Sequence, residues 1–313
     1  MIFVKSEDLK YGMRLAKPIY NKTGVLLYER NTRLTLQGIE SVKNFGLLGL
    51  YILEPAEPVP PMSEEDLDFE RFQTMAVFSI REELDNIIAG REPVNLKRLA
   101  NAIITNYGRL DHKITFTQNL RSTTDYVYKH VINTAILCAL ISAQVYYTPT
   151  EQEELVLAAL LHDIGKLLLP NKVREKYDDY DTNDLIIVKK IQNDGLGLLR
   201  PEIGIDSGVR RIVAQIHRME YGNSNLEQGK ILKSTKILKV ANLFDTMTCM
   251  KISEEAISEI AAIKYLLLNK DEFDEEIVGA LIKSINILTP GVCIELTNRE
   301  KGLVISAVSY THL

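Results

Sequence analysis

The sequence has few of the residues that mark several classes of protein. Its 313 residues contain no tryptophan and only three cysteines, Cys138, Cys249 and Cys293, which lie far apart and form no C-x-x-C pair. A sparse and odd set of cysteines is typical of reduced thiols in a reducing compartment. Ten prolines and 17 glycines are too few for a collagen-like or low-complexity chain.

The sequence also lacks a large excess of either sign of charge, and it lacks long apolar runs. The formal net charge is -5, so the composition gives no basic footprint for duplex nucleic acid, although a local pocket can still be basic. The longest apolar stretches, such as 135–140 and 155–161, are too short to span a bilayer. Glu7 and Asp8 follow closely after the first residues, so this segment lacks the apolar core of a signal peptide. We therefore expect a soluble, cytoplasmic protein without a membrane span.

Apolar residues, by contrast, make up 46% of the chain, which is enough for a sizeable core and about two domains. Residues 1–54 alternate glycines with short apolar segments, of which 25–28 and 50–53 predict strands and 35–45 predicts a helix. Residues 55–65 are rich in proline and glutamate and indicate an extended linker. Three parts are therefore expected: a small α/β module over 1–54, the linker over 55–65, and a helical domain over 66–313.

Helical periodicity fills most of the chain after the linker. Helices are expected over 69–88, 96–107, 123–146, 150–168, 184–199, 207–218, 233–250, 253–268 and 274–288. The segments 292–296 and 302–307 alternate like the strands of a terminal β-hairpin. The run 307–313 is typical of read-through at the end of an assembled sequence, so His312 is given no role. The predicted fold class is mainly α.

Histidine is sparse, with five in the chain, and one of them gives the sharpest chemical signal. His162 and Asp163 end the strongly apolar stretch Leu160-Leu161-His162-Asp163-Ile164-Gly165-Lys166. Burying such a pair is costly unless its charge is compensated, and a metal ion is one way to compensate it. Lys166 lies four residues after His162, on the same helical face, where it can meet an anionic substrate oxygen. The plainer alternative is a solvated helix end.

The order of these residues resembles the HD superfamily of metal-dependent phosphohydrolases, and within it the HD-GYP subfamily. His130 lies on a preceding helix, and Pro170 followed by Lys176 resembles the subfamily's P-x-x-I-L-x-K run after its His-Asp pair. The segment 239–248, K-V-A-N-L-F-D-T-M-T, resembles its V-A-D-x-F-D-A-M-T segment, and the segments 9–16 and 290–304 resemble its small N-terminal domain and closing hairpin. The resemblance covers nearly the whole chain and implies an HD-type helical bundle.

The resemblance also implies hydrolysis of cyclic di-GMP or a related cyclic dinucleotide by two or three metal ions. Several of the implied ligands are replaced. The next ligand histidine falls on Ile191, one of a histidine pair falls on Ile216, and the late metal aspartate falls on Asn242. Arg218 stands in place of a glutamate, the Gly-Tyr-Pro tripeptide falls on 224–226, and an expected phosphate-binding arginine after the late aspartate is missing.

The ligands that remain define one partial metal site. The first implied position consists of His130, His162, Asp163 and Asn242. The second would need Asp163, Ile191, Ile216 and His217, and it keeps two ligands, which is fewer than metal sites ordinarily use. A divalent ion such as Fe or Mn at the first position, or no metal at all, both remain open. The residues implied for catalysis are Asp163 and Lys166.

Two functions compete on this basis. The first is a degenerate HD-GYP protein, catalytically impaired, that acts as a signalling or binding module for a cyclic dinucleotide or a signalling protein. The second is an active metal-dependent phosphohydrolase that uses the remaining ligands, with Lys166 on the phosphate. The uncharged side chain of Asn242 favours the first, because an amide binds a hard cation weakly.

Simpler roles compete with both functions. His130 and His162 can be hydrogen-bonded histidines without a metal, and Lys166 can simply neutralise Asp163. Five dispersed basic residues are candidates either for an anion pocket or for a solvated face: Lys189, Lys190, Arg210, Arg211 and Arg218. A homodimer is also open.

Overall fold

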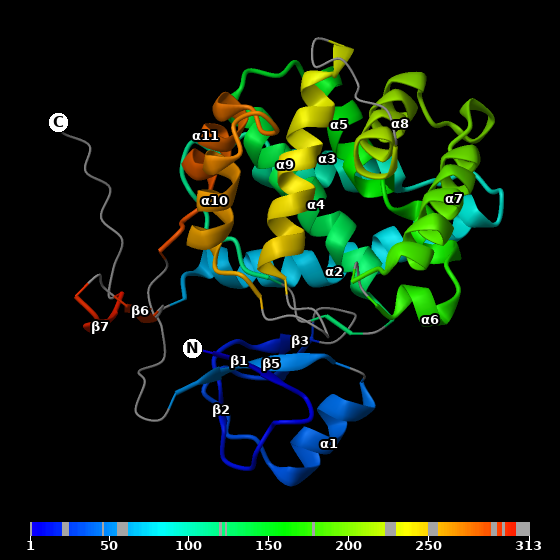
Figure 1. The fold of residues 1–313 in the computed structure, drawn as a ribbon. Helices are drawn as coiled ribbons and strands as arrows, with labels where there is room; N and C mark the ends of the chain where they lie inside the picture. Colours follow the sequence, from blue (N-terminus) through cyan, green and yellow to red (C-terminus); the bar gives the residue numbers. More distant parts are fainter. Residues whose placement is uncertain are drawn as a thin grey trace. The chain divides into compact units, whose positions relative to one another are not determined.

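The computed structural model describes residues 2–20, 25–45, 47–54, 62–118, 121–122, 124–176, 179–222, 230–249, 256–288, 293–295 and 298–304. The fold is mainly helical, as predicted (Figure 1). The chain forms two units: one combines Met1–Met75 with Ile114–Thr124 and Ile285–Leu313, and the other combines Ala76–Lys113 with Asp125–Ser284. Each unit is thus built from segments that are separated in the sequence.

Three short strands form the sheet of the first unit. β1 (Ile2–Lys5) and β2 (Arg14–Leu15) flank β5 (Gly49–Leu53), and both pair with it in antiparallel fashion. β3 (Ile19–Tyr20) and β4 (Leu26–Tyr28) form a separate antiparallel ribbon. α1 (Leu36–Asn44) begins after Thr35, whose hydroxyl accepts the Gly38 N–H. The strands expected over 25–28 and 50–53 and the helix expected over 35–45 are confirmed.

Apolar side chains from these elements enclose the small core of the first unit. Its buried members are Leu9, Leu15, Ile19, Leu34, Ile39, Val42, Leu50 and Ile52. Two later segments bond into the same unit: the Leu48 N–H donates to the Arg121 carbonyl, and the Asn286 N–H donates to the Ile114 carbonyl, both at 2.8 Å. Hydrogen bonding therefore joins chain segments from the beginning, middle and end of the sequence.

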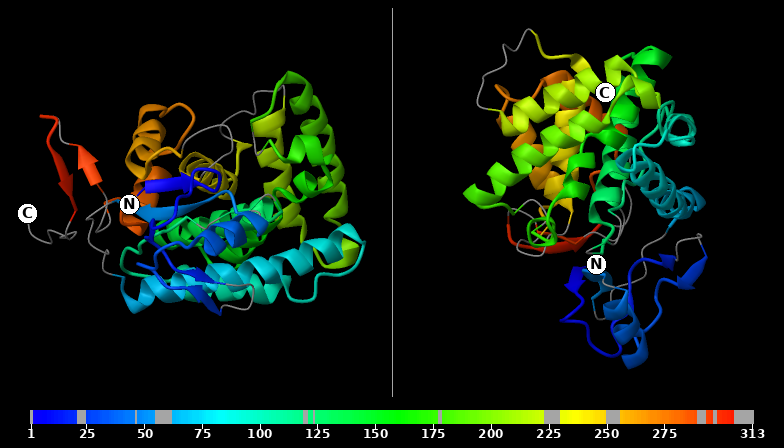
Figure 2. Two further views of the ribbon diagram at one scale, coloured as in Figure 1. Left: turned by 90° about the horizontal axis from the view of Figure 1, so that it is seen from below. Right: turned by 90° about the vertical axis from the view of Figure 1, so that its right-hand side faces the viewer.

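The predicted terminal hairpin is present. β6 (Cys293–Glu295) pairs with β7 (Lys301–Leu303) in antiparallel fashion (Figure 2). Residues 55–61 of the predicted linker, 305–307 of the predicted second hairpin strand and the final residues 308–313 lie outside the described residues.

α2 (Glu64–Ile88) begins before the expected linker ends, and the chain passes from the first unit to the second within this helix. The second unit consists of helices apart from its connecting segments. They are α3 (Leu96–Tyr107), α4 (Tyr126–Gln144), α5 (Pro149–Leu161), the 3₁₀ helix η1 (Ile164–Leu168), α6 (Asn171–Arg174), α7 (Thr182–Leu198), the 3₁₀ helix η2 (Pro201–Ile203), α8 (Ser207–Tyr221), α9 (Lys233–Thr248), α10 (Glu259–Leu268) and α11 (Glu275–Ser284).

α4 is the central helix of the second unit. It packs against α3, α5, α9 and α11, and Ile132, Ile136 and Ile141 have no solvent exposure. Among the described helices it is the one that is long and apolar enough to cross a membrane. Within the fold, however, 83% of its apolar window is buried, as in the core helix of a globular protein. His130, Asn133 and Thr134 on α4 consequently lie in the interior.

Among the described helices, two ends differ most from the sequence prediction. The helix expected over 150–168 stops at Leu161, and a 3₁₀ helix follows from Ile164, so His162 and Asp163 stand at a junction. The helix expected to begin at residue 253 begins at Glu259, where the Ser258 hydroxyl accepts the Ala261 N–H. Residues 250–255 lie outside the described part of the chain.

Candidate metal centre

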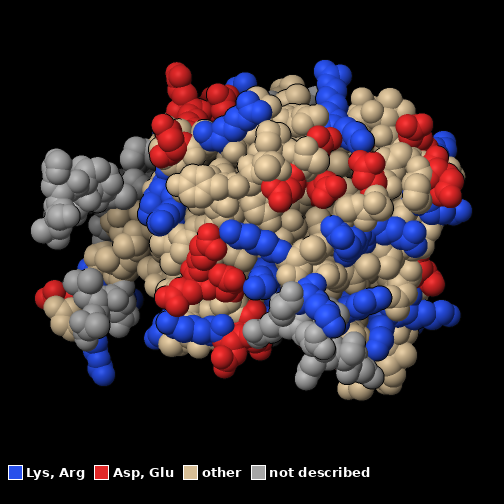
Figure 3. Space-filling model, turned by 90° about the horizontal axis from the view of Figure 1, so that it is seen from above, with Lys and Arg blue, Asp and Glu red and all other residues tan. Residues whose placement is uncertain are grey.

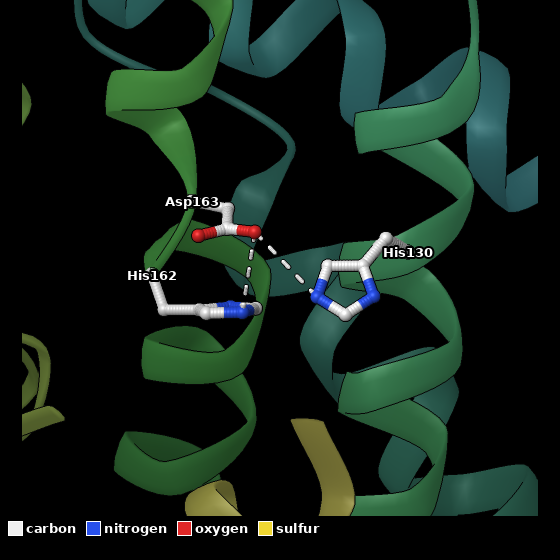
Figure 4. A group of neighbouring side chains, drawn as sticks. All are labelled: His130, His162 and Asp163. Atoms are coloured by element: carbon white, nitrogen blue, oxygen red, sulfur yellow. Dashed lines mark ion pairs between the residues drawn. The ribbon is translucent and has the colours of Figure 1, made fainter. Parts of the chain in front are cut away.

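Three predicted ligands converge in the second unit. His130 comes from the start of α4, and His162 and Asp163 come from the junction between α5 and η1 (Figure 4). The Asp163 Oδ2 atom lies 3.5 Å from the His130 Nε2 atom and 3.7 Å from the His162 Nε2 atom. The ligand atoms of the three residues all lie within 4.8 Å of one another. The structure thus brings together two imidazole nitrogens and one carboxylate oxygen.

Each imidazole is oriented by a hydrogen bond on its other nitrogen. The His162 Nδ1 atom lies 2.7 Å from the Ala159 carbonyl oxygen, and the His130 Nδ1 atom lies 2.6 Å from the Asp245 Oδ2 atom. Because both partners are acceptors, Nδ1 carries the proton in each ring and Nε2 keeps its lone pair. Metal-binding histidines ordinarily donate their second nitrogen in this way, to a carbonyl or a carboxylate.

Asp245 has a role that the sequence did not predict. α9 packs on α4 and turns this carboxylate toward His130. The Asn133 Nδ2 atom donates to the second oxygen, Oδ1, at 2.9 Å. Neither Asn133 nor Asp245 is exposed to solvent. The two residues together fix the tautomer and the orientation of the His130 ring.

The charges of the site are set by burial and by Lys166. The Lys166 Nζ atom lies 2.7 Å from Asp163 Oδ2. Burial alone raises the pKa of Asp163, but Lys166 and the two histidines outweigh it and hold that pKa well below its usual range. Burial lowers the pKa of His162 to about 4, so its ring is neutral at pH 7. Asp163 is therefore ionised and His162 is free of a second proton.

The donor atoms fit a metal ion. The Nε2 atoms of His130 and His162 are buried, and among the described residues they have no hydrogen-bond partner. Such unsatisfied buried atoms are costly, and a cation between them and the Asp163 carboxylate would satisfy both. Two imidazoles and a carboxylate suit Zn, Fe or Mn rather than calcium or magnesium, which prefer oxygen ligands.

The two other predicted ligands make different contacts. The ring of His217 is buried, and its Nε2–H donates to the His162 carbonyl oxygen at 2.6 Å. Burial lowers the pKa of His217, and its Nδ1 atom has no hydrogen-bond partner among the described residues. The side-chain amide of Asn242 donates to a carboxylate oxygen of Glu220 on α8. His217 thus supports the backbone of His162, and Asn242 is engaged with a neighbouring helix.

Apolar side chains stand at the two positions where the resemblance implies further histidines. Ile216 has no solvent exposure. Ile191 packs against an apolar cluster that includes Leu169, Val173 and Val188. The residues 224–226, which correspond to the Gly-Tyr-Pro tripeptide, lie outside the described part of the chain.

Gln192 is a further site residue that the sequence did not indicate. It is buried, and its Nε2–H donates to the Asp163 Oδ1 atom at 2.8 Å. Two glycines bring its helix α7 against η1: a Cβ atom on Gly195 would lie 2.6 Å from the Gly165 Cα atom. The signal available in the sequence was that Gln192 is a polar residue inside a helical apolar pattern. Asn133 stands in the same kind of pattern.

Comparisons with known proteins find several similarities. The HD domain family matches residues 95–277. The chain is 22% identical over 189 residues to cyclic di-GMP phosphodiesterase PA4108 of Pseudomonas aeruginosa, covering 59% of this chain and 46% of that protein. It is 26% identical over 152 residues to the cyclic di-GMP phosphodiesterase response regulator RpfG of Xanthomonas campestris, covering 47% of this chain and 40% of that protein.

Two further similarities follow the same pattern. Cyclic di-GMP phosphodiesterase PdeB of Borreliella burgdorferi is 22% identical over 191 residues, covering 58% of this chain and 49% of that protein. The chain therefore matches less than half the length of each of these relatives. The solved structure of Bd1817, an HDG"Y"P protein from Bdellovibrio bacteriovorus, superposes with a TM-score of 0.50 at 17% identity, covering 90% of this chain and 97% of that one. At this identity the superposition supports the fold.

Proposed function

The chain belongs to the HD domain family, and from that premise we propose that it is an HD-GYP-type homologue of cyclic-dinucleotide phosphodiesterases acting as a binding or signalling module. It holds one divalent ion, and hydrolysis by two metal ions is impaired. The observation that carries the proposal is the convergence of His130, His162 and Asp163, with apolar side chains at 191 and 216. Two-metal catalysis needs a second ion to clamp the phosphate, and isoleucine cannot ligate one.

In this proposal the residues have separate tasks. His130, His162 and Asp163 supply the ligands, and Asn242 is kept as a candidate fourth ligand. Asp245 and the Ala159 carbonyl orient the two imidazoles. A bound divalent ion would neutralise phosphate oxygens and lower the pKa of a bound water. Lys166, beside Asp163, would turn its ammonium to an anionic oxygen of the ligand.

The partner that we propose is a cyclic dinucleotide, and the location is the cytoplasm. Three relatives are cyclic di-GMP phosphodiesterases by name. A signalling protein, or a second copy of the chain, is the competing partner.

An active mononuclear phosphohydrolase is the second candidate. It is favoured by the three protein ligands, because catalytic sites commonly use three and keep a position for water or substrate. Lys166 would then bind the phosphate during turnover.

One preparation separates the two candidates. The full-length protein is loaded with Mn or Fe, its metal content is measured by mass spectrometry, and cyclic di-GMP binding and hydrolysis are assayed. We expect about one ion per chain, nucleotide binding, and no turnover. His162→Ala should lose the metal, whereas His112→Ala, at an exposed histidine, should keep it. Turnover that depends on stoichiometric metal and on His162 would establish the enzyme, and a chain that takes up no metal would contradict both candidates.

A further inference from the structure

A small hollow beside the metal group contains two cationic side chains. Its lining consists of Tyr126, Val127, His130, Asp163, Lys166, Arg174 and Tyr180. The cavity measures about 10 Å³, which is about the space of one water molecule. The basic residues in this lining are Lys166 and Arg174, and none of the five dispersed basic candidates from the sequence belongs to it.

Arg174 is held in place by its own short helix. Val173, the preceding residue of α6, is buried in the apolar cluster with Leu169 and Val188. After the helix, Lys176 forms ion pairs with Asp181 and Asp184, which anchor the following segment. The position of Arg174 in the fold is therefore fixed from both sides.

The guanidinium group of Arg174 has capacity left for an anion. Its Nη2 atom donates to the Asn171 side-chain oxygen at 2.7 Å. Among the described residues, no carboxylate lies within ion-pair distance of Arg174. A guanidinium offers five donors in a rigid fork that matches carboxylate and phosphate oxygens. One neutral acceptor leaves most of those donors for water or a ligand.

Position 174 also departs from the pattern that the chain resembles. In the P-x-x-I-L-x-K run, Pro170 and Lys176 fix the alignment, and the apolar leucine position falls on Arg174. The arginine expected after the late aspartate is missing. The chain therefore has a positive charge beside the metal group at a position where the pattern has an apolar residue.

The charges around the hollow favour an anion once a metal is bound. With both histidines neutral as ligands, the carboxylates of Asp163 and Asp245 cancel the charges of Lys166 and Arg174. A divalent ion then leaves two positive charges in excess. It also competes with Lys166 for Asp163, which allows the ammonium to turn to a ligand.

We propose that Arg174 contacts the ligand of this site, and that it binds a phosphate group together with Lys166. The proposal rests on the proposed function, since the phosphate is taken to belong to a cyclic dinucleotide. Arg174 thereby takes the role of the missing arginine. It precedes position 242 in the sequence, whereas the missing arginine would follow it. The hollow of about 10 Å³ has room for about one water molecule, so a phosphate group there requires lining side chains to move.

The test is a titration of the metal-loaded, full-length protein. Cyclic di-GMP is the probe in one arm and inorganic phosphate in the other, and both are followed by calorimetry. Arg174→Gln should weaken binding about ten- to a hundredfold in both arms, because a charge-assisted contact is lost. Arg174→Lys should recover part of the affinity, since it keeps the charge but not the fork.

Lys172→Gln is the matched control, because it removes a charge from an exposed position on the same helix. Metal content and the thermal midpoint should be unchanged in all these variants. Equal affinity of wild type and Arg174→Gln would overturn the proposal, and so would a loss confined to the dinucleotide arm, which would assign Arg174 to a base. If no metal loads, the proposed function fails, and the same titrations are done on the metal-free protein. The role of Arg174 is then overturned if the wild type binds neither probe, or if it binds them with the same affinity as Arg174→Gln.

Discussion

The protonation states and roles of single side chains in this protein depend on their burial and on the groups beside them. His162 is neutral because it is buried, and Asp163 is ionised because Lys166 lies beside it. Asp245 has no solvent exposure and serves His130 from another helix. At the residue scale, therefore, the state of the metal group depends on burial, on a neighbour three residues away and on a partner distant in sequence.

Asp245→Asn should damage the metal site although it preserves the shape of the side chain. Asn133 donates to the Oδ1 atom of residue 245, so an amide there would keep its oxygen toward Asn133 and turn its NH₂ toward His130. The His130 ring would then have to accept at Nδ1 and carry its proton at Nε2, where the metal binds. We expect metal affinity to fall about ten- to a hundredfold, measured by competition with a chelator.

Asp85→Asn, on the exposed side of α2, is the control and should leave metal affinity unchanged. An Asp245→Asn protein with wild-type affinity would show that the His130–Asp245 contact does not set the tautomer.

Glu70 on α2 predicts a pH dependence that is independent of the metal site. Burial raises its pKa above the ordinary value, and the Lys17 charge only partly opposes this. The folded state thus holds the proton more tightly than the unfolded state, so stability falls as pH rises through the unfolded pKa, about 4.5, toward the raised value. Glu70→Gln should flatten this part of the stability curve and stabilise the protein at pH 7, as measured by urea unfolding at several pH values.

The exposed Glu82→Gln on the same helix should keep the wild-type pH profile. A Glu70→Gln protein that is less stable than wild type at pH 7 would mean that the ionised carboxylate is stabilising.

The sequence predicts part of the site because local patterns identify part of it. His130, His162, Asp163 and Lys166 follow from the order of residues in a known pattern, and the structure brings them together. Asp245, Asn133 and Gln192 do not follow from it, because their partners lie on other helices. Arg174 belongs with them, since only the fold shows which side chains share its hollow.

Helices and their ends are the next scale. The apolar period of 3.6 residues identifies α3 over residues 96–107, and the structure has the same bounds. The end of α5 was missed, because the apolar pattern continues through η1 while the backbone tightens into a 3₁₀ helix. Gly165 has a packing reason there, since a Cβ on it would lie 2.3 Å from the Gln192 Oε1 atom.

Gly195→Ala should destabilise the contact between α7 and η1. Its Cβ would lie 2.6 Å from the Gly165 Cα and 2.7 Å from the Gly165 nitrogen, and backbone atoms cannot move aside cheaply. We expect a loss of about 1–3 kcal/mol in the free energy of unfolding, measured with urea. Metal affinity should fall as well, because η1 carries Lys166 and adjoins Asp163.

Gly197→Ala is the matched variant two residues later on α7. A Cβ there meets no described atom within 4 Å, so the change should be neutral or add up to about 1 kcal/mol through helix propensity. Equal effects at both positions would contradict the close approach of the two segments.

At the scale of the whole molecule, charge is spread widely and metal binding is local. Figure 3 shows acidic and basic side chains interspersed over the face it presents. The metal group lies within the second unit, in the part formed by Asp125–Ser284. The domain division expected at residues 55–65 stays a proposal, because the two units combine segments from several parts of the chain.

Metal removal should lower the stability of the second unit. A ligand present at a hundred times its Kd stabilises the state that binds it by about 2.7 kcal/mol. Adding Mn to the metal-free protein should therefore raise its unfolding midpoint, and hydrogen exchange should slow within Ala76–Lys113 and Asp125–Ser284. His162→Ala should show neither effect, and a midpoint that rises equally in this variant would indicate binding elsewhere.

The division of the first unit into three segments has a consequence for synthesis on the ribosome. Residues 1–75 emerge early, but the Arg121 carbonyl that accepts the Leu48 N–H comes later, and the Asn286 N–H that bonds to Ile114 comes after the whole helical unit. At roughly 5–20 residues per second, the interval between Thr124 and Ile285 takes on the order of ten seconds or more. The unit that contains residues 1–75 is therefore completed after the second unit, although the strands of its sheet all precede residue 54.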